Sequence, residues 1–258
     1  MYRKSKILYN KAMIKSISGK KAVVFGGSGG IGAAVSRKLA SEGVNLLIHG
    51  GHDEEKLLRI KEDIQRSYPD ITVDTLLMPV EKLLPFESGA AEAAVKNADI
   101  ICFCCGPFLQ KPVHETSLSE IEAVINSNFV FPASVIAFAL PFFAARKYGR
   151  FIVFGGTDTA SFRGFRTNAM YAAAKTALCS LVKSVAIEYS ASGITCNAIL
   201  PGFVETEYLS PELKKSLEKK IPGGKLIPPE DIAEAVSFLL KTDSVNGTFL
   251  NIDCGWAP

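Results

Sequence analysis

Short runs of consecutive apolar residues alternate along the chain with longer segments whose apolar positions recur every three or four residues. This alternation predicts parallel strands joined by crossover helices. Because several runs are apolar at consecutive positions, we expect helices to cover both faces of the sheet. The predicted fold is α/β, a single-domain Rossmann-type doubly wound parallel sheet in a three-layer α/β/α arrangement. The predicted strands are Ala22–Phe25, Asn45–Ile48, Ile71–Leu77, Ile100–Phe103, Phe151–Phe154, Ile194–Leu200 and Phe249–Ile252.

Helical spacing predicts the connecting segments Ile31–Glu42 and Asp53–Tyr68, and later the helices Tyr171–Tyr189 and Pro229–Leu240. The uncharged stretch Phe129–Ala145 is shorter than the roughly 20 residues that span a bilayer and contains two prolines. We therefore expect a buried or interface helix there, and no membrane association.

Turn signals flank one short helical segment near the C-terminus. They are Pro201-Gly202 on one side and Pro222-Gly223-Gly224 on the other. Because this segment interrupts the regular alternation after a predicted strand, we expect it to act as a lid.

Composition narrows the picture. With 258 residues, 48% of them hydrophobic, the chain can bury one large core. We expect one domain over residues 18–258, preceded by a basic extension over residues 1–17. The formal net charge of +3 is small, which favours no nucleic-acid partner. Most of the six cysteines lie in or beside apolar runs, without disulfide or zinc-site spacing. We expect a reducing cytoplasmic location and assign no metal.

A glycine-rich turn directly follows the first predicted strand and opens the first predicted helix. Glycines let the backbone approach a pyrophosphate, and a helix N-terminus offers free N–H groups and a favourable dipole. A flexible surface turn is the alternative, but strand, loop and helix in this order favour dinucleotide binding. The predicted cofactor contacts in this turn are Gly26, Ser28, Gly29, Gly30, Ile31 and Gly32.

The end of the second strand bears on the choice of cofactor. It reads His49-Gly50-Gly51-His52, with no acidic residue to bind a ribose 2′-hydroxyl and no arginine to bind a 2′-phosphate. The missing carboxylate removes one reason to prefer NAD. The polar residues nearby that could contact a 2′-phosphate are Ser28, His49 and His52. The prediction is NADP or NAD, with NADP preferred, and includes contacts from His49, Gly50 and Gly51.

Tyr171 and Lys175 are spaced by one helical turn, so phenol and ammonium lie on the same helix face. A nearby lysine charge favours tyrosinate, which suits the phenol to exchange a proton with a carbonyl or alcohol oxygen. A helical tyrosine beside a solvated lysine is the ordinary alternative for this pair taken alone.

Together with the glycine turn, the pair resembles the short-chain dehydrogenase/reductase family, over about Ser18 to Trp256. In its general layout, the chain is most similar to the 3-oxoacyl carrier-protein reductases of this family. The resemblance implies that Tyr171 is the acid/base, that Lys175 is its partner and a ribose contact, and that Asn128 holds a relay water. It also implies cofactor contacts from the loop residues Pro201, Gly202, Val204 and Thr206.

Three positions depart from the family pattern. Asp158 stands where a serine usually binds the substrate oxygen, so either Asp158 is protonated, Thr157 or Thr159 substitutes, or the substrate brings a donor. Pro79 replaces an acidic adenine contact, and we expect Val80 beside it to contact the cofactor. The loop after the fourth strand keeps only the glycine of its usual motif, and its predicted cofactor contacts are Cys104, Cys105 and Gly106.

The leading hypothesis is an NAD(P)(H)-dependent oxidoreductase that moves hydride between nicotinamide and a small-molecule carbonyl or secondary alcohol, similar to a 3-oxoacyl reductase. Its catalytic residues would be Asn128, Asp158, Tyr171 and Lys175. Two alternatives are a cofactor-binding sensor or interaction protein without turnover, and an enzyme that uses the same pair for dehydration or isomerisation. The resemblance also implies a homotetramer or homodimer.

Overall fold

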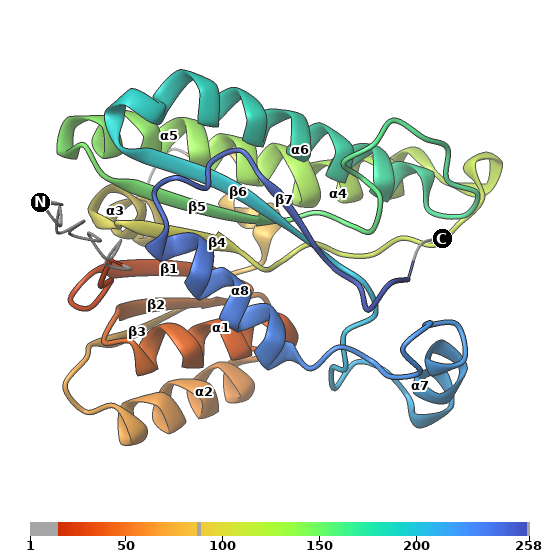
Figure 1. Ribbon diagram of the computed structural model, residues 1–258, viewed down its shortest axis with the longest axis horizontal. Helices are drawn as coiled ribbons and strands as arrows, with labels where there is room; N and C mark the ends of the chain where they lie inside the picture. The colour runs from red at the N-terminus through yellow and green to blue at the C-terminus, as the bar shows by residue number, and fades with distance from the viewer. Residues whose placement is uncertain (1–14, 87–88, 257–258) are drawn as a thin grey trace, which may run out of the picture.

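The computed structural model describes residues 15–86 and 89–256 and contains one sheet of seven parallel strands. The strand order is β3-β2-β1-β4-β5-β6-β7, and helices cover both faces (Figure 1). The predicted three-layer doubly wound fold is confirmed. The strands are β1 (Lys21–Phe25), β2 (Asn45–Gly50), β3 (Val73–Leu77), β4 (Ile100–Phe103), β5 (Gly149–Phe154), β6 (Ile194–Pro201) and β7 (Phe249–Ile252).

The winding of the chain reverses beside β1. The chain runs from β1 outward through β2 to β3, and then crosses back to place β4 on the other side of β1. Val23 of β1 accordingly pairs with Leu47 of β2 and with Ile101 of β4. In an open parallel sheet, such a reversal leaves a crevice at the carboxyl ends of the strands, where ligands bind.

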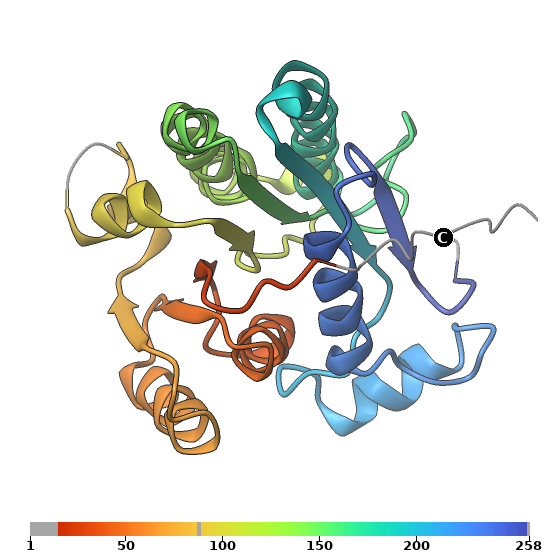
Figure 2. The ribbon, with the colours of Figure 1, turned by 60° about the vertical axis from the view of Figure 1, so that its left-hand side comes forward.

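Two groups of helices make the outer layers. One face carries α1 (Gly30–Ser41), α2 (Glu54–Ser67) and α8 (Pro229–Lys241), and the other carries α3 (Ala90–Asn97) with two long helices. Figure 2 shows the two groups on opposite sides of the twisted sheet. The two long helical segments are Leu118–Arg146 and Ala169–Ser192.

Alternate residues of the strands divide into two hydrophobic cores. Val24, Ile48 and Cys102 pack beneath α1, α2 and α8, whereas the next residues along the strands face the opposite helices. The second core is rich in phenylalanine, and the ring of Phe25 lies 5.6 Å from that of Phe103. Because both strand faces are buried, the sequence shows consecutive apolar residues instead of alternation.

The segment predicted as Phe129–Ala145 is part of a longer helix. It consists of α4 (Leu118–Ile125), a π-helical turn (Asn126–Val130) and α5 (Phe131–Arg146), which together span 29 residues. The expectation that it is too short to span a bilayer is therefore wrong. It and Ala169–Ser192 are long and apolar enough to cross a membrane, but 44% of the most apolar window of each is buried inside the molecule. Their buried residues form the second core, as expected of core helices.

Local signals explain several boundaries. Asp53 caps α2 by accepting a hydrogen bond from the backbone of Lys56, and Ser117 and Glu120 form a capping box at the start of α4. The prediction began the third strand at Ile71, whereas β3 begins at Val73. α6 (Ala169–Tyr189) begins two residues before the predicted Tyr171.

Part of the predicted N-terminal extension and the whole of the predicted lid lie within the described residues. Ile17, placed in the predicted extension, is buried in the first core, and the extension's residues 1–14 lie outside the described residues. The predicted lid contains α7 (Pro211–Glu218), which packs on a small cluster of its own. That cluster is formed by Leu217, Ile221 and Leu226, with Phe203 and Leu209 packed against it.

Candidate functional site

The glycine turn after β1 is tightly enclosed. Gly26 has a φ of +75°, and a Cβ there would lie 2.8 Å from the Cβ of Cys105 in the loop after β4. A Cβ at Gly32 would overlap the carbonyl oxygen of Gly26. Glycine is thus required both for the conformation of the turn and for the close packing of α1 against it.

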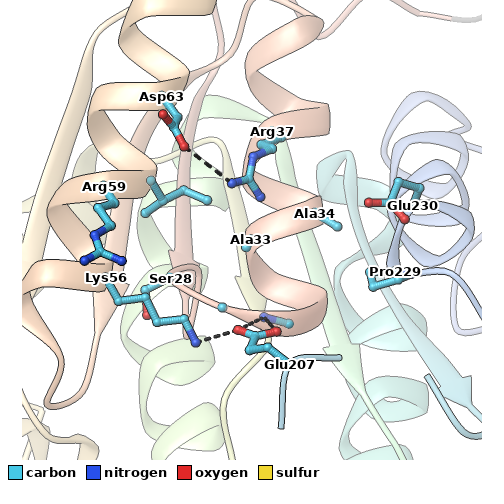
Figure 3. Close-up of a pocket in the computed structure, with 13 residues that line it drawn as sticks. Ser28, Ala33, Ala34, Arg37, Lys56, Arg59, Asp63, Glu207, Pro229 and Glu230 are labelled. Carbon is cyan, nitrogen blue, oxygen red and sulfur yellow. Dashed lines mark hydrogen bonds and ion pairs between the residues drawn. The ribbon is translucent and has the colours of Figure 1, made fainter. Parts of the chain in front are cut away.

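The N-terminus of α1 already receives an internal anion. The backbone N–H of Gly30 donates to both carboxylate oxygens of Glu207, at 3.1 and 3.2 Å. The ammonium of Lys56 lies 2.5 Å from the same carboxylate (Figure 3). Burial opposes ionisation of Glu207, but these bonds outweigh it and lower its pKa. The turn is therefore a working anion site, as a helix N-terminus preceded by glycines should be.

His49 holds the glycine turn in place. Its Nδ1 accepts from the backbone N–H of Gly26 at 3.2 Å, and its Nε2 lies 2.7 Å from the carbonyl oxygen of Met78. Because Nδ1 accepts, the proton resides on Nε2, which donates to Met78. Burial lowers the pKa of His49, which favours this neutral ring. Both nitrogens are engaged within the protein, so the ring positions the turn and leaves no nitrogen for a phosphate.

A cavity of about 390 Å³ lies beside this turn, between α1, α2 and the start of α8. Its charged lining combines Arg37, Lys56 and Arg59 with the carboxylates of Asp63, Glu207 and Glu230 (Figure 3). Sequence reasoning predicted Ser28, Gly29 and Gly30 at this place but missed Lys56 and Glu207. The signal for Lys56 was its position in the first turn of α2, one helical turn after the end of β2.

Tyr171 and Lys175 occupy successive turns of α6, and the Lys175 ammonium lies 5.6 Å from the centre of the Tyr171 ring. Lys175 is only 4% exposed, and burial lowers its pKa to about 8. Burial also raises the pKa of Tyr171 to about 12. Phe108 packs edge-on against the phenol ring at 4.9 Å. Lys175 is therefore buried beside a half-buried phenol, and the solvated-lysine alternative does not describe it.

Cys105 lies between the glycine turn and this pair. Its Cβ is next to Gly26, and its thiol is close enough to Lys175 to interact electrostatically with the ammonium. Burial raises the pKa of Cys105 to about 11, which keeps the thiol protonated and unreactive at neutral pH. The structure thus brings the predicted cofactor turn and the predicted proton-transfer pair close to the same residue, Cys105.

Asn128 lies in the π-helical turn and is fully buried. Its Nδ2 donates to the carbonyl oxygens of Pro107 and Val124, at 3.0 and 3.1 Å, while its Oδ1 accepts no hydrogen bond from the residues that the structure describes. A Cβ at Gly106 would overlap that oxygen, so only glycine fits beside it. A buried acceptor without a protein partner is suited to bind a water molecule.

The segment that carries Asp158 lies against the phenol, because a Cβ at Gly156 would be 3.2 Å from Cε1 of Tyr171. Asp158 has a φ of +60° and forms an ion pair with Arg163. The hydroxyl of Thr157 donates to the carbonyl oxygen of Pro201, and that of Thr159 donates to Gly156. Both threonine protons are thus committed to the backbone, which leaves neither as the free donor considered from the sequence.

The loop after β6 crosses the glycine turn. Gly202 packs on Asp253, Val204 forms a bridge with Ile227, and Thr206 lies 3.3 Å from where a Cβ of Gly30 would be. The other predicted contacts lie along the strand ends. Gly50 ends β2 and Gly51 follows it, Val80 opens a short 3₁₀ helix after β3, and Cys104 follows β4.

Comparison with known proteins identifies the family. A family model described as enoyl-(acyl carrier protein) reductase matches residues 26–257. The chain is 32% identical over 244 residues to a 3-oxoacyl-[acyl-carrier-protein] reductase of Rickettsia bellii, covering 93% of this chain and 97% of that protein. The chain belongs to the short-chain dehydrogenase/reductase family. The resemblance drawn from the glycine turn and the Tyr171–Lys175 pair is thereby confirmed, and with it the prediction of an oxidoreductase that acts on alcohol or carbonyl groups.

Other members of the family show its range. A 3β-hydroxysteroid dehydrogenase of Eggerthella lenta is 28% identical over 257 residues, covering 94% of this chain and 95% of that protein. The crystal structure of a 3-oxoacyl (acyl-carrier-protein) reductase from Agrobacterium tumefaciens C58, with NADP bound, matches with a TM-score of 0.84. It is 22% identical and covers 96% of this chain and 100% of that one, so it supports the fold of this short-chain dehydrogenase/reductase.

Proposed function

We propose that this protein catalyses NADP(H)-dependent hydride transfer to and from a carbonyl or secondary alcohol, with Tyr171 as the acid/base. The observation that carries this proposal is that half-buried Tyr171 and buried Lys175 share one face of α6, with Cys105 between Lys175 and the glycine turn. A half-buried tyrosine with a buried ammonium on the next helical turn is suited to proton exchange with a substrate oxygen.

The residues at the turn fit a nicotinamide dinucleotide. Gly26 and Gly32 allow the tight turn and the close packing of α1 against it, and the Glu207 carboxylate on the Gly30 amide shows that this helix end takes an anion. The bound cofactor supplies the hydride. Family members such as the Agrobacterium tumefaciens reductase hold NADP, which supports NADP over NAD here together with the absence of an acidic residue at Gly50 and Gly51.

Tyr171 and Lys175 divide the proton chemistry. At neutral pH the phenol is protonated, because burial raises its pKa to about 12, so it is ready to donate to a developing alkoxide. Lys175, with a pKa of about 8, carries most of its charge at neutral pH and stabilises the tyrosinate left behind. Asn128 would hold a water at its free Oδ1, through which the proton is replaced.

We propose that Asp158 does not replace the family's serine in binding the substrate oxygen. Its ion pair with Arg163 compensates its charge, which reduces the opposition between a carboxylate and tyrosinate that the sequence alone suggests. The proposed role of Asp158 is therefore to order the loop over the phenol together with Arg163, while Tyr171 and Lys175 serve the substrate oxygen.

For the substrate we propose a 3-oxoacyl thioester. Similarity to the Rickettsia bellii reductase over 93% of the chain supports it, and the exposed ring of Phe108 beside Tyr171 offers apolar contact to an acyl chain. The proposed assembly is a homotetramer or homodimer, and the proposed location is the cytoplasm. Light scattering tests the assembly, and a monomer at working concentration would contradict it.

The decisive test of the activity follows nicotinamide absorbance during reduction of a 3-oxoacyl thioester. We expect one NADPH oxidised per hydroxy product, and Tyr171→Phe to lower kcat by about 10²- to 10⁴-fold while NADPH still binds. Product formation without net cofactor oxidation would support dehydration or isomerisation instead. Binding of NADPH without turnover of any carbonyl substrate would support the sensor alternative.

A further inference from the structure

Lys56 reaches from α2 to the glycine turn. A Cβ at Gly29 would overlap its ammonium, so the absence of a side chain at Gly29 makes room for it. The ammonium donates to the hydroxyl of Tyr208 at 2.7 Å and forms an ion pair with Glu207. Burial opposes the charge on Lys56, but these partners outweigh it and raise its pKa, so the ammonium is a stable cation here.

Lys56 lies beside the end of β2. In dinucleotide-binding sheets the adenosine ribose lies at the end of the second strand, where an acidic residue binds its 2′-hydroxyl or a basic residue binds a 2′-phosphate. Ser28 Oγ lies 3.2 Å from where a Cβ of Gly50 would be, and a Cβ at Gly51 would meet open space. Asp53, the acidic residue that follows, is engaged as the cap of α2 by the backbone of Lys56. Ser28 and Lys56 therefore flank the place where a ribose substituent would lie.

We propose that Lys56 binds the 2′-phosphate of NADP, with Ser28, and so determines the preference for NADP over NAD. The inference rests on the proposed function, because it assumes that the glycine turn holds a nicotinamide dinucleotide. Lys56 supplies from α2 the positive charge that the end of β2 lacks.

The present partners of Lys56 are exchangeable. The other two cations of the cavity pair with carboxylates of α2. Arg59 pairs with Glu55 of the same helix, and Arg37 of α1 lies 3.9 Å from Asp63. Glu207, in contrast, belongs to the loop after β6, and its carboxylate is 48% exposed. The Gly30 amide would exchange this carboxylate for a pyrophosphate oxygen, and Lys56 would be freed from Glu207 to bind the 2′-phosphate.

Binding measurements on variants test the inference without turnover. Wild type, Lys56→Gln and Lys56→Arg are titrated by calorimetry with NADPH, NADH, 2′,5′-ADP and 5′-AMP. We expect Lys56→Gln to weaken NADPH and 2′,5′-ADP by about 10- to 100-fold, the loss typical of a charged hydrogen bond, and to leave NADH and 5′-AMP nearly unchanged. Lys56→Arg keeps the charge and should retain most of the NADPH affinity.

Lys61→Gln is the matched control, because it removes the same charge from the same helix at a residue that does not line the cavity. It should leave all four affinities unchanged. If Lys56→Gln weakens NADH as much as NADPH, or leaves NADPH unchanged, the role of Lys56 is overturned while the proposed function stands. If wild type binds neither NADPH nor NADH, the proposed function fails and the inference fails with it.

Discussion

The two parts of the candidate site, the glycine turn and the Tyr171–Lys175 pair, use charge in opposite ways. Around the glycine turn, the ammonium of Lys56 and the carboxylate of Glu207 are partly exposed, paired, and drawn from separate elements. Around Tyr171, the ammonium of Lys175 is buried beside the thiols of Cys105, Cys179 and Cys104, and burial lowers its pKa. The charges of Lys56 and Glu207 are therefore held in an exchangeable ion pair. The charge of Lys175, in contrast, lies in a buried environment that disfavours the charged form.

The difference follows from what each part must do. Recognition of a cofactor that enters and leaves requires contacts that form and break at little net cost, which partly exposed ion pairs provide. Proton transfer requires pKa values displaced from those in water, which burial of Lys175 and Tyr171 provides. One candidate site can therefore bind a cofactor reversibly at the glycine turn and transfer protons at the Tyr171–Lys175 pair.

Removal of the buried charge should have the largest effect. We expect Lys175→Met to lower kcat by about 10²- to 10⁴-fold, because the tyrosinate loses its stabilising ammonium. The melting temperature should not fall, since methionine carries no desolvation cost in that pocket. Kinetics and thermal unfolding measure both. A variant with normal kcat would show that the two parts do not differ as described.

The pH dependence of reduction should report the same ammonium. Because the pKa of Lys175 is about 8, its charge is present below that pH and lost above it. We expect kcat/KM for carbonyl reduction to fall as pH rises through 8, by about tenfold per unit once the charge is lost. A profile that stays level well above pH 8 would contradict this role of the Lys175 charge.

Removal of the Glu207 carboxylate should have a moderate effect, and it should increase the affinity for the cofactor instead of lowering a function. Glu207→Gln removes a negative charge from the place of the pyrophosphate, so NADPH and NADH should both bind severalfold more tightly. Glu205→Gln is the control, because Glu205 pairs with Lys214 and makes no contact with the turn. Calorimetric titration compares the two variants. Weaker binding in Glu207→Gln would mean that the carboxylate assists the cofactor.

We expect the smallest effect from protonation of His49, which supports the glycine turn, and it should appear as a loss of folding stability. His49 has a pKa below its ordinary value, so the unfolded chain binds its proton first as pH falls. The stability due to neutral His49 is therefore complete above about pH 6.5 and is lost as pH falls through the folded pKa. Urea unfolding of wild type should show this loss, at most about 1.4 kcal/mol per pH unit, and His49→Gln should lack it. An equal slope in the variant would assign the loss elsewhere.

Much of the architecture could be predicted because it depends on local pattern. Buried parallel strands require consecutive apolar residues, and the turn at Gly26 requires glycine, so both leave clear signals. α3 and α4 were missed because each has only eight residues, about two helical turns, over which a periodic pattern repeats only twice. The length of the helix through Phe129 was misjudged because the π-helical turn joins two segments that differ in polarity.

The candidate site was predicted where its residues are close in sequence, as with Tyr171 and Lys175. The contacts of Lys56 with Glu207 could not be predicted, because they join residues far apart in the chain. Nor could the hydrogen bonds of His49, which depend on the pairing of β2 with β1 and β3. Tertiary contacts of this kind decide whether a polar residue is free to bind a ligand.

The most direct test of the account is a titration of wild type and Gly30→Asp with NADPH and NADH, followed by nicotinamide fluorescence. Gly30 has a φ of +49° and its amide binds the internal carboxylate, so an aspartate there would strain the turn and repel a pyrophosphate. Gly164→Asp, at a glycine with no neighbouring atom within 4 Å of a Cβ, is the control. We predict saturable binding in wild type and the control, tighter for NADPH, and none in Gly30→Asp. Equal binding in all three proteins, or none in wild type, would contradict the account.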